Sequence, residues 1–368
     1  MTDVVLVSAP FSGIEVHFRL LAGELARLPD VRVEAIWLDH EPIRWRWSPL
    51  RWNWLAAAAW STSRSIAECR RCGFDPDVAM LNYVNPVWLR RRRRRLPPVV
   101  LHLDTTPLIT SSMGIHYLQR HARHAAIEQV KRRLYRWAFA VPRRIIAVSE
   151  LVRDSLVDDY GVDTSLVTVI PYPVDTEWWT RRVGDEARAG RLRVLFVGAD
   201  WARKGGDVLL AAARHPALRT CEFHVVTRHP VPDAPPNVVV HLDVTPGSSR
   251  LFELFESASV FALPTLADLS PIVLTEAMAM ELPVVTTDVG AISELVADGE
   301  DGFVVAIGDA GSFAERLREL VESPELRARM GRRARATVVE ERSLATAVVR
   351  YLDVIRSARP AEVPSGSA

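Results

Sequence analysis

The sequence predicts an α/β protein of two domains, each built around a parallel sheet. Apolar runs of strand length alternate with longer helical patterns along the chain, which is typical of parallel α/β units. With 368 residues, 48% of them hydrophobic and 25% charged, the chain is long enough to form two cores. A polar, mostly aperiodic stretch at residues 172–190 separates the two halves and is expected to be the linker.

The first half, residues 1–171, opens with an apolar run, followed by a Ser12-Gly13 turn and by helical periodicity over 18–28. Its expected strands are residues 4–9, 31–38, 78–81, 99–103, 145–149 and 167–170. We expect these elements to form an N-terminal Rossmann-like domain.

The second half, residues 191–342, repeats the same alternation and predicts a second Rossmann-like domain. Its expected strands are residues 193–198, 223–227, 238–242, 260–263, 283–287 and 303–305. Residues 343–358 have the apolar spacing of a helix, which we expect to pack back on the N-terminal domain. The last residues, 359–368, are expected to form a disordered tail.

Composition excludes several functional classes. The net charge of +1 does not suit a nucleic-acid binder. Cys69, Cys72 and Cys221 are too few for a disulfide framework, and the Cys69/Cys72 pair lacks the second pair of a zinc site. We expect no membrane span, because no apolar run reaches 18 residues. Since the N-terminus enters a strand without a leader pattern, we expect a cytoplasmic protein.

Nucleotide cofactors are not predicted either. Neither half carries the GxGxxG fingerprint after its first strand, which argues against an NAD or FAD enzyme, and the sequence has no Walker motif.

An acidic pair, Asp268 and Glu276, brackets the start of an expected helix in the stretch 261–305. Ser270 is expected to be the N-cap and Pro271 the first helical residue. The N–H groups of the next two residues, Ile272 and Val273, would then face outward at the positive helix end, which favours an anion. Carboxylates repel phosphate but accept hydrogen bonds from hydroxyls. The pattern therefore predicts a phosphorylated, polyhydroxylated ligand, such as a nucleotide sugar.

A second loop offers cations. The run VLFVGADWARKGG predicts a strand that ends at Gly198, a loop that carries Arg203 and Lys204, and a helix after the glycine pair. Two adjacent cations suit a diphosphate, the arginine as a fork and the lysine as a point charge. In open α/β sheets, ligands bind beyond the carboxyl ends of the strands, where both loops are expected to lie.

These residues resemble the retaining glycosyltransferases of family 4, which have the GT-B fold of two Rossmann-like domains. The family pattern has a strand that ends in Gly and a Lys-Gly six residues later, which here are Gly198 and Lys204-Gly205. Its Glu-x7-Glu motif, followed by Ala-Met-Ala and a Pro-Val-Val strand, appears here as Asp268-x7-Glu276 with AMAMELPVV. The resemblance is close over 193–305 and looser in the first half.

The resemblance implies an enzyme that moves a sugar from a nucleoside-diphosphate sugar to an acceptor hydroxyl and retains the anomeric configuration without a covalent enzyme intermediate. Arg203 and Lys204 would stabilise the departing diphosphate, while Asp268 would orient donor-sugar hydroxyls and Glu276 the ribose hydroxyls. No metal or other cofactor is expected, because nothing in the sequence looks like a metal-binding DxD motif. The residues expected to bind the donor are Gly198, Leu269, Ser270, Ile272, Val273, Thr227, Asp243 and Val244.

Four positions depart from the family pattern. The first acid is Asp268 rather than Glu, and the residue after the strand glycine is Ala199 rather than Arg, so Arg203 is expected to take over at the diphosphate. On the acceptor side, the family's Gly-Gly is Ser12-Gly13. The family's His-Asp is here Leu103-Asp104, where His102 or Asp104 would substitute.

Residues 41–95 are rich in tryptophan and arginine, with twelve arginines between residues 44 and 95. This combination suits an anionic membrane surface, where the rings lie at headgroup level and the cations meet phosphate. The alternatives are tryptophans in a core or an acceptor pocket and arginines in a solvated turn. The expected partners are a UDP- or GDP-sugar and a glycan, lipid-linked or small-molecule acceptor. Two other functions stay open: a GT-B phosphorylase or epimerase, and a non-catalytic GT-B scaffold.

Overall fold

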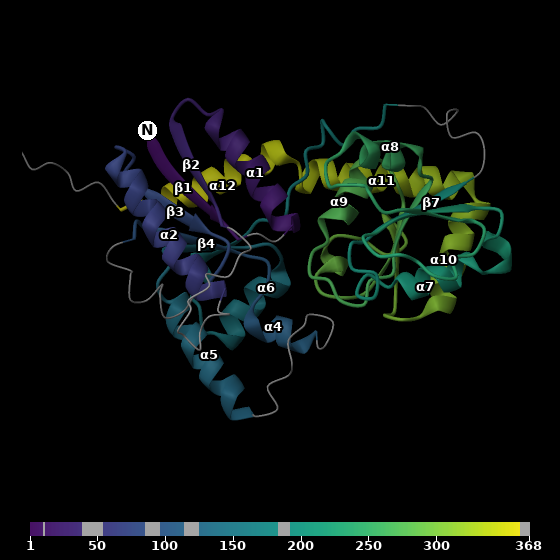
Figure 1. The fold of residues 1–368 in the computed structure, drawn as a ribbon, viewed down its shortest axis with the longest axis horizontal. Coiled ribbons are helices and arrows are strands. Elements are labelled where there is room, and N and C mark those ends of the chain that lie inside the picture. Colours follow the sequence, from purple (N-terminus) through teal and green to yellow (C-terminus); the bar gives the residue numbers. More distant parts are fainter. Residues whose placement is uncertain (10–11, 39–53, 85–95, 114–124, 183–191, 361–368) are drawn as a thin grey trace, which may run out of the picture. The chain divides into compact units, whose positions relative to one another are not determined.

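The computed structural model of the protein describes residues 1–9, 12–38, 54–84, 96–113, 125–182 and 192–360 (Figure 1). The chain divides into two compact units. The first is formed by most of the chain up to Pro171 together with the residues from Thr346 onward, and the second by Tyr172–Ala345. Each unit contains one six-stranded sheet whose neighbouring strands are all parallel, which confirms the predicted α/β class.

The sheet of the first unit has the strand order β2-β1-β3-β4-β5-β6. Its strands are β1 (Thr2–Ser8), β2 (Val31–Trp37), β3 (Val78–Leu81), β4 (Val99–Leu103), β5 (Arg144–Ala147) and β6 (Val167–Val169). The central strands are buried along their whole length, as expected for a parallel sheet that is covered on both faces.

Helices pack around this sheet (Figure 1). They are α1 (Ser12–Ala26), α2 (Trp54–Arg71), α4 (Pro107–Ser112), α5 (Ala125–Phe139), α6 (Glu150–Asp154), which continues as a π-helical turn (Ser155–Asp159), and α12 (Leu344–Ala358). The expectation that helical structure begins near residue 18 is wrong, because α1 already starts at Ser12. The turn-forming Ser12-Gly13 pair therefore lies in the first turn of the helix.

The C-terminal helix α12 is held to the first unit by a buried polar cluster. The hydroxyl of Tyr351 shares a hydrogen bond of 2.8 Å with Nε2 of His102 on β4 and one of 3.2 Å with Nε2 of His17 on α1. The ring of His102 stacks on those of Tyr351 and His17. Burial lowers the pKa of His102 to about 3, and burial together with the nearby His102 lowers the pKa of His17. Both imidazoles are therefore neutral at pH 7.

We expect the stability of the first unit to fall below pH ~6.5, the ordinary histidine pKa. In that range the unfolded chain takes up protons that the buried His17 and His102 do not bind, so each histidine costs about 1.4 kcal/mol per pH unit. Above pH ~6.5 both states hold neutral imidazoles and the effect vanishes. Urea unfolding between pH 5 and pH 8 measures this slope. His102→Gln should reduce the slope, whereas His229→Gln, which removes an exposed histidine, should leave it unchanged; equal slopes in all three proteins would contradict the prediction.

The sheet of the second unit has the order β12-β11-β10-β7-β8-β9. Its strands are β7 (Arg193–Val197), β8 (Glu222–Val226), β9 (Val238–His241), β10 (Val260–Leu263), β11 (Val284–Thr287) and β12 (Gly302–Val305). Its helices are α7 (Gly206–Ala213), α8 (Ser249–Ser257), α9 (Ile272–Ala279), α10 (Ala310–Glu322) and α11 (Pro324–Glu341). Fully buried phenylalanines, among them Phe196, Phe223 and Phe261, fill the core between sheet and helices.

Part of the expected linker is packed structure. Trp179 is only 5% exposed, and its ring meets that of Phe255 on α8 edge-on at 5.1 Å between centroids. Val174 forms an isolated parallel bridge with Ser343, just before α12. Residues 172–182 therefore belong to the second unit, with Val174 and Trp179 in its core. Residues 183–190 lie outside the described residues, as do 361–368 of the expected tail.

Candidate active site

The second unit has a topological switch point between β7 and β10. These strands are neighbours in the sheet, and the chain winds away from them in opposite directions, through β8 and β9 on one side and through β11 and β12 on the other. Loops that leave the carboxyl ends of two such strands diverge, and the space between them is where ligands bind in open α/β folds. Both predicted loops, 198–205 after β7 and 264–271 after β10, lie at this point.

The loop after β7 is a tight turn that presents two cations. Asp200 organises it, because its backbone carbonyl accepts a 2.9 Å hydrogen bond from the N–H of Lys204, and its side chain accepts one of 3.2 Å from the N–H of Arg203. The loop ends at Gly205, whose φ of +75° places it in the left-handed region, and α7 follows at once.

Arg203 joins this loop to the loop after β10. Its carbonyl accepts hydrogen bonds from the N–H of Leu266 at 2.8 Å and from the hydroxyl of Thr265 at 3.2 Å. Its guanidinium donates to the carbonyl of Ala267 at 2.9 Å. Two segments more than 60 residues apart in the sequence thus form one surface.

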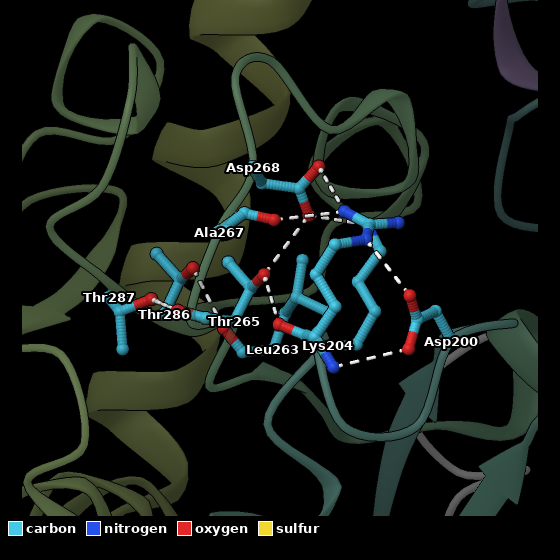
Figure 2. Close-up of polar contacts among 9 residues, drawn as sticks. Asp200, Lys204, Leu263, Thr265, Ala267, Asp268, Thr286 and Thr287 are labelled. Carbon is cyan, nitrogen blue, oxygen red and sulfur yellow. Dashed lines mark hydrogen bonds and ion pairs between the residues drawn. The ribbon is translucent and has the colours of Figure 1, made fainter. Parts of the chain in front are cut away.

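Asp268 lies where the two loops meet (Figure 2). One carboxylate oxygen, Oδ2, accepts a hydrogen bond from the ammonium of Lys204. The Thr265 hydroxyl lies 3.2 Å from this oxygen and 3.2 Å from the Arg203 carbonyl, so these two acceptors share its single proton. The other oxygen, Oδ1, lies 3.4 Å from Nη1 of Arg203. Asp268 is only 7% exposed. The predicted acid and both predicted cations are therefore one ion-paired cluster.

Thr287 and Gly290 support the loop that carries Asp268. Thr287 on β11 donates its hydroxyl to the carbonyl of Thr265. Gly290 lies so close to the backbone of Asp268 that a Cβ atom there would be 2.1 Å from the Asp268 carbonyl oxygen. These contacts fix the position of the Asp268 backbone, and with it the position of the carboxylate.

Helix α9 starts one residue later than predicted. It begins at Ile272, and Pro271 occupies the cap position without a side-chain hydrogen bond, so the prediction that Ser270 is the N-cap is wrong. Pro271 has an extended backbone, with φ −71° and ψ 109°, so the first helical residue is Ile272 and the cap moves from Ser270 to Pro271. The N–H of Leu274 bonds to the Pro271 carbonyl at 3.0 Å. The N–H groups of Ile272 and Val273 precede this bond in the first turn, where helical N–H groups have no intrahelical partner.

Glu276 lies in the second turn of α9, half-buried, and no side chain in the described part of the chain forms an ion pair with it. Burial raises its pKa to about 8. At neutral pH this carboxyl group is therefore mostly protonated, which a surface glutamate would not be.

The remaining predicted donor residues lie around the same sheet edge. Thr227 follows β8 and is buried, and Asp243 and Val244 follow β9. Leu269 is buried, and its carbonyl accepts a 2.8 Å hydrogen bond from Ala291. The N–H of Gly198 is used by the carbonyl of Val226, so Gly198 acts by allowing close approach: a Cβ atom there would lie 2.8 Å from Cβ of Lys204.

The predicted acceptor-side residues lie in the first unit. Ser12 and Gly13 begin α1 next to the switch point between β1 and β3. His102 is 1% exposed, and its Nε2 is occupied by Tyr351, so its contacts support a role in the core rather than at an acceptor. Asp104 is half-buried, and burial raises its pKa to about 6.

Asn82 is a residue that the sequence did not indicate. Its side chain accepts a 2.7 Å hydrogen bond from the N–H of Ala9 and donates to the hydroxyl of Ser8, and thereby ties the end of β3 to the end of β1. The sequence feature that could have indicated Asn82 is its position directly after the buried strand β3.

Other predictions concern metals, cysteines and membranes. The described residues contain no cluster of three or more His, Cys, Asp or Glu side chains suited to a metal ion. Cys69, Cys72 and Cys221 are not joined in disulfide bonds. Among the described helices none combines the length and the apolar character that a membrane span requires. Most of the Trp/Arg segment 41–95 lies outside the described residues, which cover only 54–84 of it.

Family models match both units. The model of the group 1 glycosyl transferases matches residues 191–323, and the model of glycosyltransferase family 4 matches residues 11–178. The chain therefore belongs to glycosyltransferase family 4, with the GT-B architecture that the sequence motifs predicted.

Curated relatives are similar over about half of the chain. A D-inositol 3-phosphate glycosyltransferase from Streptomyces avermitilis is 29% identical over 221 residues, which are 53% of this chain and 48% of the relative. An alpha-maltose-1-phosphate synthase from Mycobacterium tuberculosis is 32% identical over 243 residues, which are 58% of this chain and 62% of the relative. The matched region thus spans about half to three-fifths of these relatives.

Solved structures share the fold at low identity. Sucrose-phosphate synthase from Thermosynechococcus elongatus has a TM-score of 0.77 and 17% identity and covers 97% of this chain and 98% of its own. HepE from Anabaena, in complex with UDP-glucose, has a TM-score of 0.70 and 16% identity and covers 97% of this chain and 100% of its own.

Proposed function

We propose that the protein is a glycosyltransferase that moves a sugar from a nucleoside-diphosphate sugar to an acceptor hydroxyl with retention of configuration. The observation that carries the proposal is the convergence of Arg203, Lys204 and Asp268 beside the N-terminus of α9 at the switch point of the second unit. Two cations and a helix N-terminus suit a diphosphate, and a nearby carboxylate suits hydroxyls.

In this function Arg203, Lys204 and the N–H groups of Ile272 and Val273 stabilise the negative charge that grows on the departing diphosphate. Such fixed electrostatic stabilisation is usually the largest catalytic contribution. Asp268 orients hydroxyls of the donor sugar, and Glu276 contacts the ribose hydroxyls. The reaction uses these side chains in place of a metal ion or another cofactor.

The relatives support the choice of substrates. HepE was solved with UDP-glucose, which favours a UDP-sugar as donor, with a GDP-sugar as the second choice. The curated relatives are named for inositol 3-phosphate and maltose 1-phosphate, which favours a small or phosphorylated hydroxyl acceptor. The alternative acceptor is a glycan or a lipid-linked molecule. In that case the Trp/Arg segment 41–95 would bind an anionic membrane surface on the cytoplasmic side.

Incubation with a panel of UDP- and GDP-sugars tests the proposal. Slow hydrolysis to the free nucleoside diphosphate, without inorganic phosphate as co-substrate, supports a transferase. Sugar 1-phosphate formed only with inorganic phosphate would indicate a phosphorylase, and interconversion of the sugar without release would indicate an epimerase. Failure to bind any donor would overturn the proposal in favour of a scaffold.

The pKa of Glu276 leads to a specific expectation for nucleotide binding. If ribose hydroxyls donate to this carboxyl group, the ligand prefers the ionised form and lowers the pKa from about 8. Nucleotide affinity should then fall as the pH drops below 8, by up to about tenfold per pH unit, and binding at pH 7 should release a proton. Calorimetry in buffers of different ionisation enthalpy measures that proton. Glu276→Gln should bind without pH dependence, and a wild-type affinity that is flat between pH 6 and pH 9 would exclude this contact.

A further inference from the structure

The Asp268 carboxylate occupies the place where the proposed function puts a diphosphate. Both of its oxygens are engaged, Oδ2 by Lys204 and Thr265 and Oδ1 by Arg203. The side chains of Lys204 and Asp268 are 12% and 10% exposed, so water screens this pair weakly.

Within the cluster, two positive and two negative side chains balance each other. Arg203 and Lys204 face Asp268, and Arg203 also lies 3.4 Å from the carboxylate of Asp200. A diphosphate that approaches these cations therefore meets a carboxylate already bound to them. Because like charges at this distance repel, the diphosphate binds only when Asp268 gives up its contacts with the cations.

A displaced carboxylate needs new hydrogen-bond donors. The Thr265 hydroxyl stays beside it and supplies one donor. A nucleotide sugar supplies further donors in its sugar hydroxyls, whereas a nucleoside diphosphate has no sugar at that end. Since a buried charge that loses its partners is costly, the two ligands differ in what they offer Asp268.

We propose that Asp268 is an internal competitor for the diphosphate site and that its displacement makes the site prefer the intact nucleotide sugar over the nucleoside diphosphate product. This inference rests on the proposed function. After transfer, Asp268 loses the sugar hydroxyls and returns to Lys204 and Arg203, which expels the diphosphate. The same residue thereby orients the donor and promotes product release.

Binding measurements on the wild type and on Asp268→Asn test this preference. Asparagine keeps the shape and removes the charge that competes for the cations. We expect Asp268→Asn to bind UDP or GDP about tenfold or more tightly than the wild type does, and the nucleotide sugar no more tightly, so that the preference for the sugar is lost. Inorganic pyrophosphate should follow the nucleoside diphosphate. An unchanged ratio of the two affinities would overturn the inference.

Asp200→Asn is the matched control. It removes an acid that also contacts Arg203, but the side chain of Asp200 is 52% exposed and does not touch Lys204. It should change the affinities for both ligands by the same factor and leave their ratio as in the wild type. A change of ratio equal to that of Asp268→Asn would show that general charge in the loop, and not competition by Asp268, sets the preference.

A measurement on the wild type tests the competition between Asp268 and the diphosphate even if Asp268→Asn does not fold. Lys131 and Lys204 are the only lysines of the sequence, so isotope-labelled lysine shows each side chain as a separate NMR signal. Pyrophosphate or UDP should shift the Lys204 signal as its partner changes from carboxylate to phosphate, while Lys131 stays unchanged. A Lys204 signal that does not move when ligand binds would overturn the inference. A wild-type protein that binds no nucleotide sugar would instead refute the proposed function itself.

Discussion

Replacing Lys204 by alanine is expected to lower the rate of donor turnover by about 100- to 1,000-fold, the range seen when one fixed donor to a developing negative charge is removed. Lys204 is 12% exposed and held in place by Asp268, so its ammonium is already positioned when charge grows on the diphosphate. A preorganised cation in a poorly hydrated site contributes more than one that must be ordered during the reaction.

The loss should appear mainly in kcat rather than in the stability of the fold. Lys204→Ala leaves Asp268 with Arg203 and Thr265 as partners, which limits the cost of the lost ion pair. Lys204→Arg should recover part of the rate, because it restores the charge with a different donor geometry.

The other lysine provides the control. Lys131 lies on α5 in the first unit and pairs with Glu128 at 3.0 Å. Lys131→Ala removes the same charge from the protein and should retain wild-type turnover. Donor hydrolysis and transfer assays on the three variants, with circular dichroism to confirm folding, would contradict the role of Lys204 if Lys204→Ala and Lys131→Ala had equal rates.

The sequence was sufficient for the strands and for the two loops of the site. The boundaries of all twelve described strands lie within two residues of the predicted ranges, because buried parallel strands are short apolar runs between polar loops. The switch point depends on the order of the strands in the sheet, and the pattern of apolar residues in the sequence does not contain that order. The position of both loops at the carboxyl ends of strands placed the loops of Lys204 and Asp268 at one edge of the sheet, and the motif resemblance supported that placement.

The internal ion pair was not predictable from the pattern. Asp268 was expected to meet sugar hydroxyls and Lys204 a diphosphate, and the structure shows that these two groups bind each other. The residues that support the ion pair gave only weak sequence signals: Thr265 stands two residues after a buried strand, and Asp200 stands three residues before Arg203. Contacts of this kind depend on how closely two distant loops approach, which sequence spacing does not contain.

The closeness of that approach explains why Gly205 is required. Its φ is +75°, and a Cβ atom there would lie 1.8 Å from the carbonyl oxygen of Pro264 at the end of β10. The loop that carries Lys204 thus contacts the loop that carries Asp268 at Gly205. A side chain there would be strained by the left-handed backbone and would clash with the Pro264 carbonyl.

Gly205→Ala is therefore expected to destabilise the second unit by about 2–5 kcal/mol. The left-handed conformation costs an alanine about 1–2 kcal/mol, and relief of the clash with Pro264 adds about 1–3 kcal/mol. Gly247 is the matched control, because its φ is +71° and no atom lies within 4 Å of the Cβ position. Gly247→Ala should cost only the conformational part. Urea unfolding of both variants isolates the steric part as their difference, and nucleotide binding should weaken in Gly205→Ala alone, because separation of the two loops breaks the cluster of Lys204 and Asp268. Equal losses of stability in the two variants would show that the loops yield to a methyl group and that their close contact does not hold the site together.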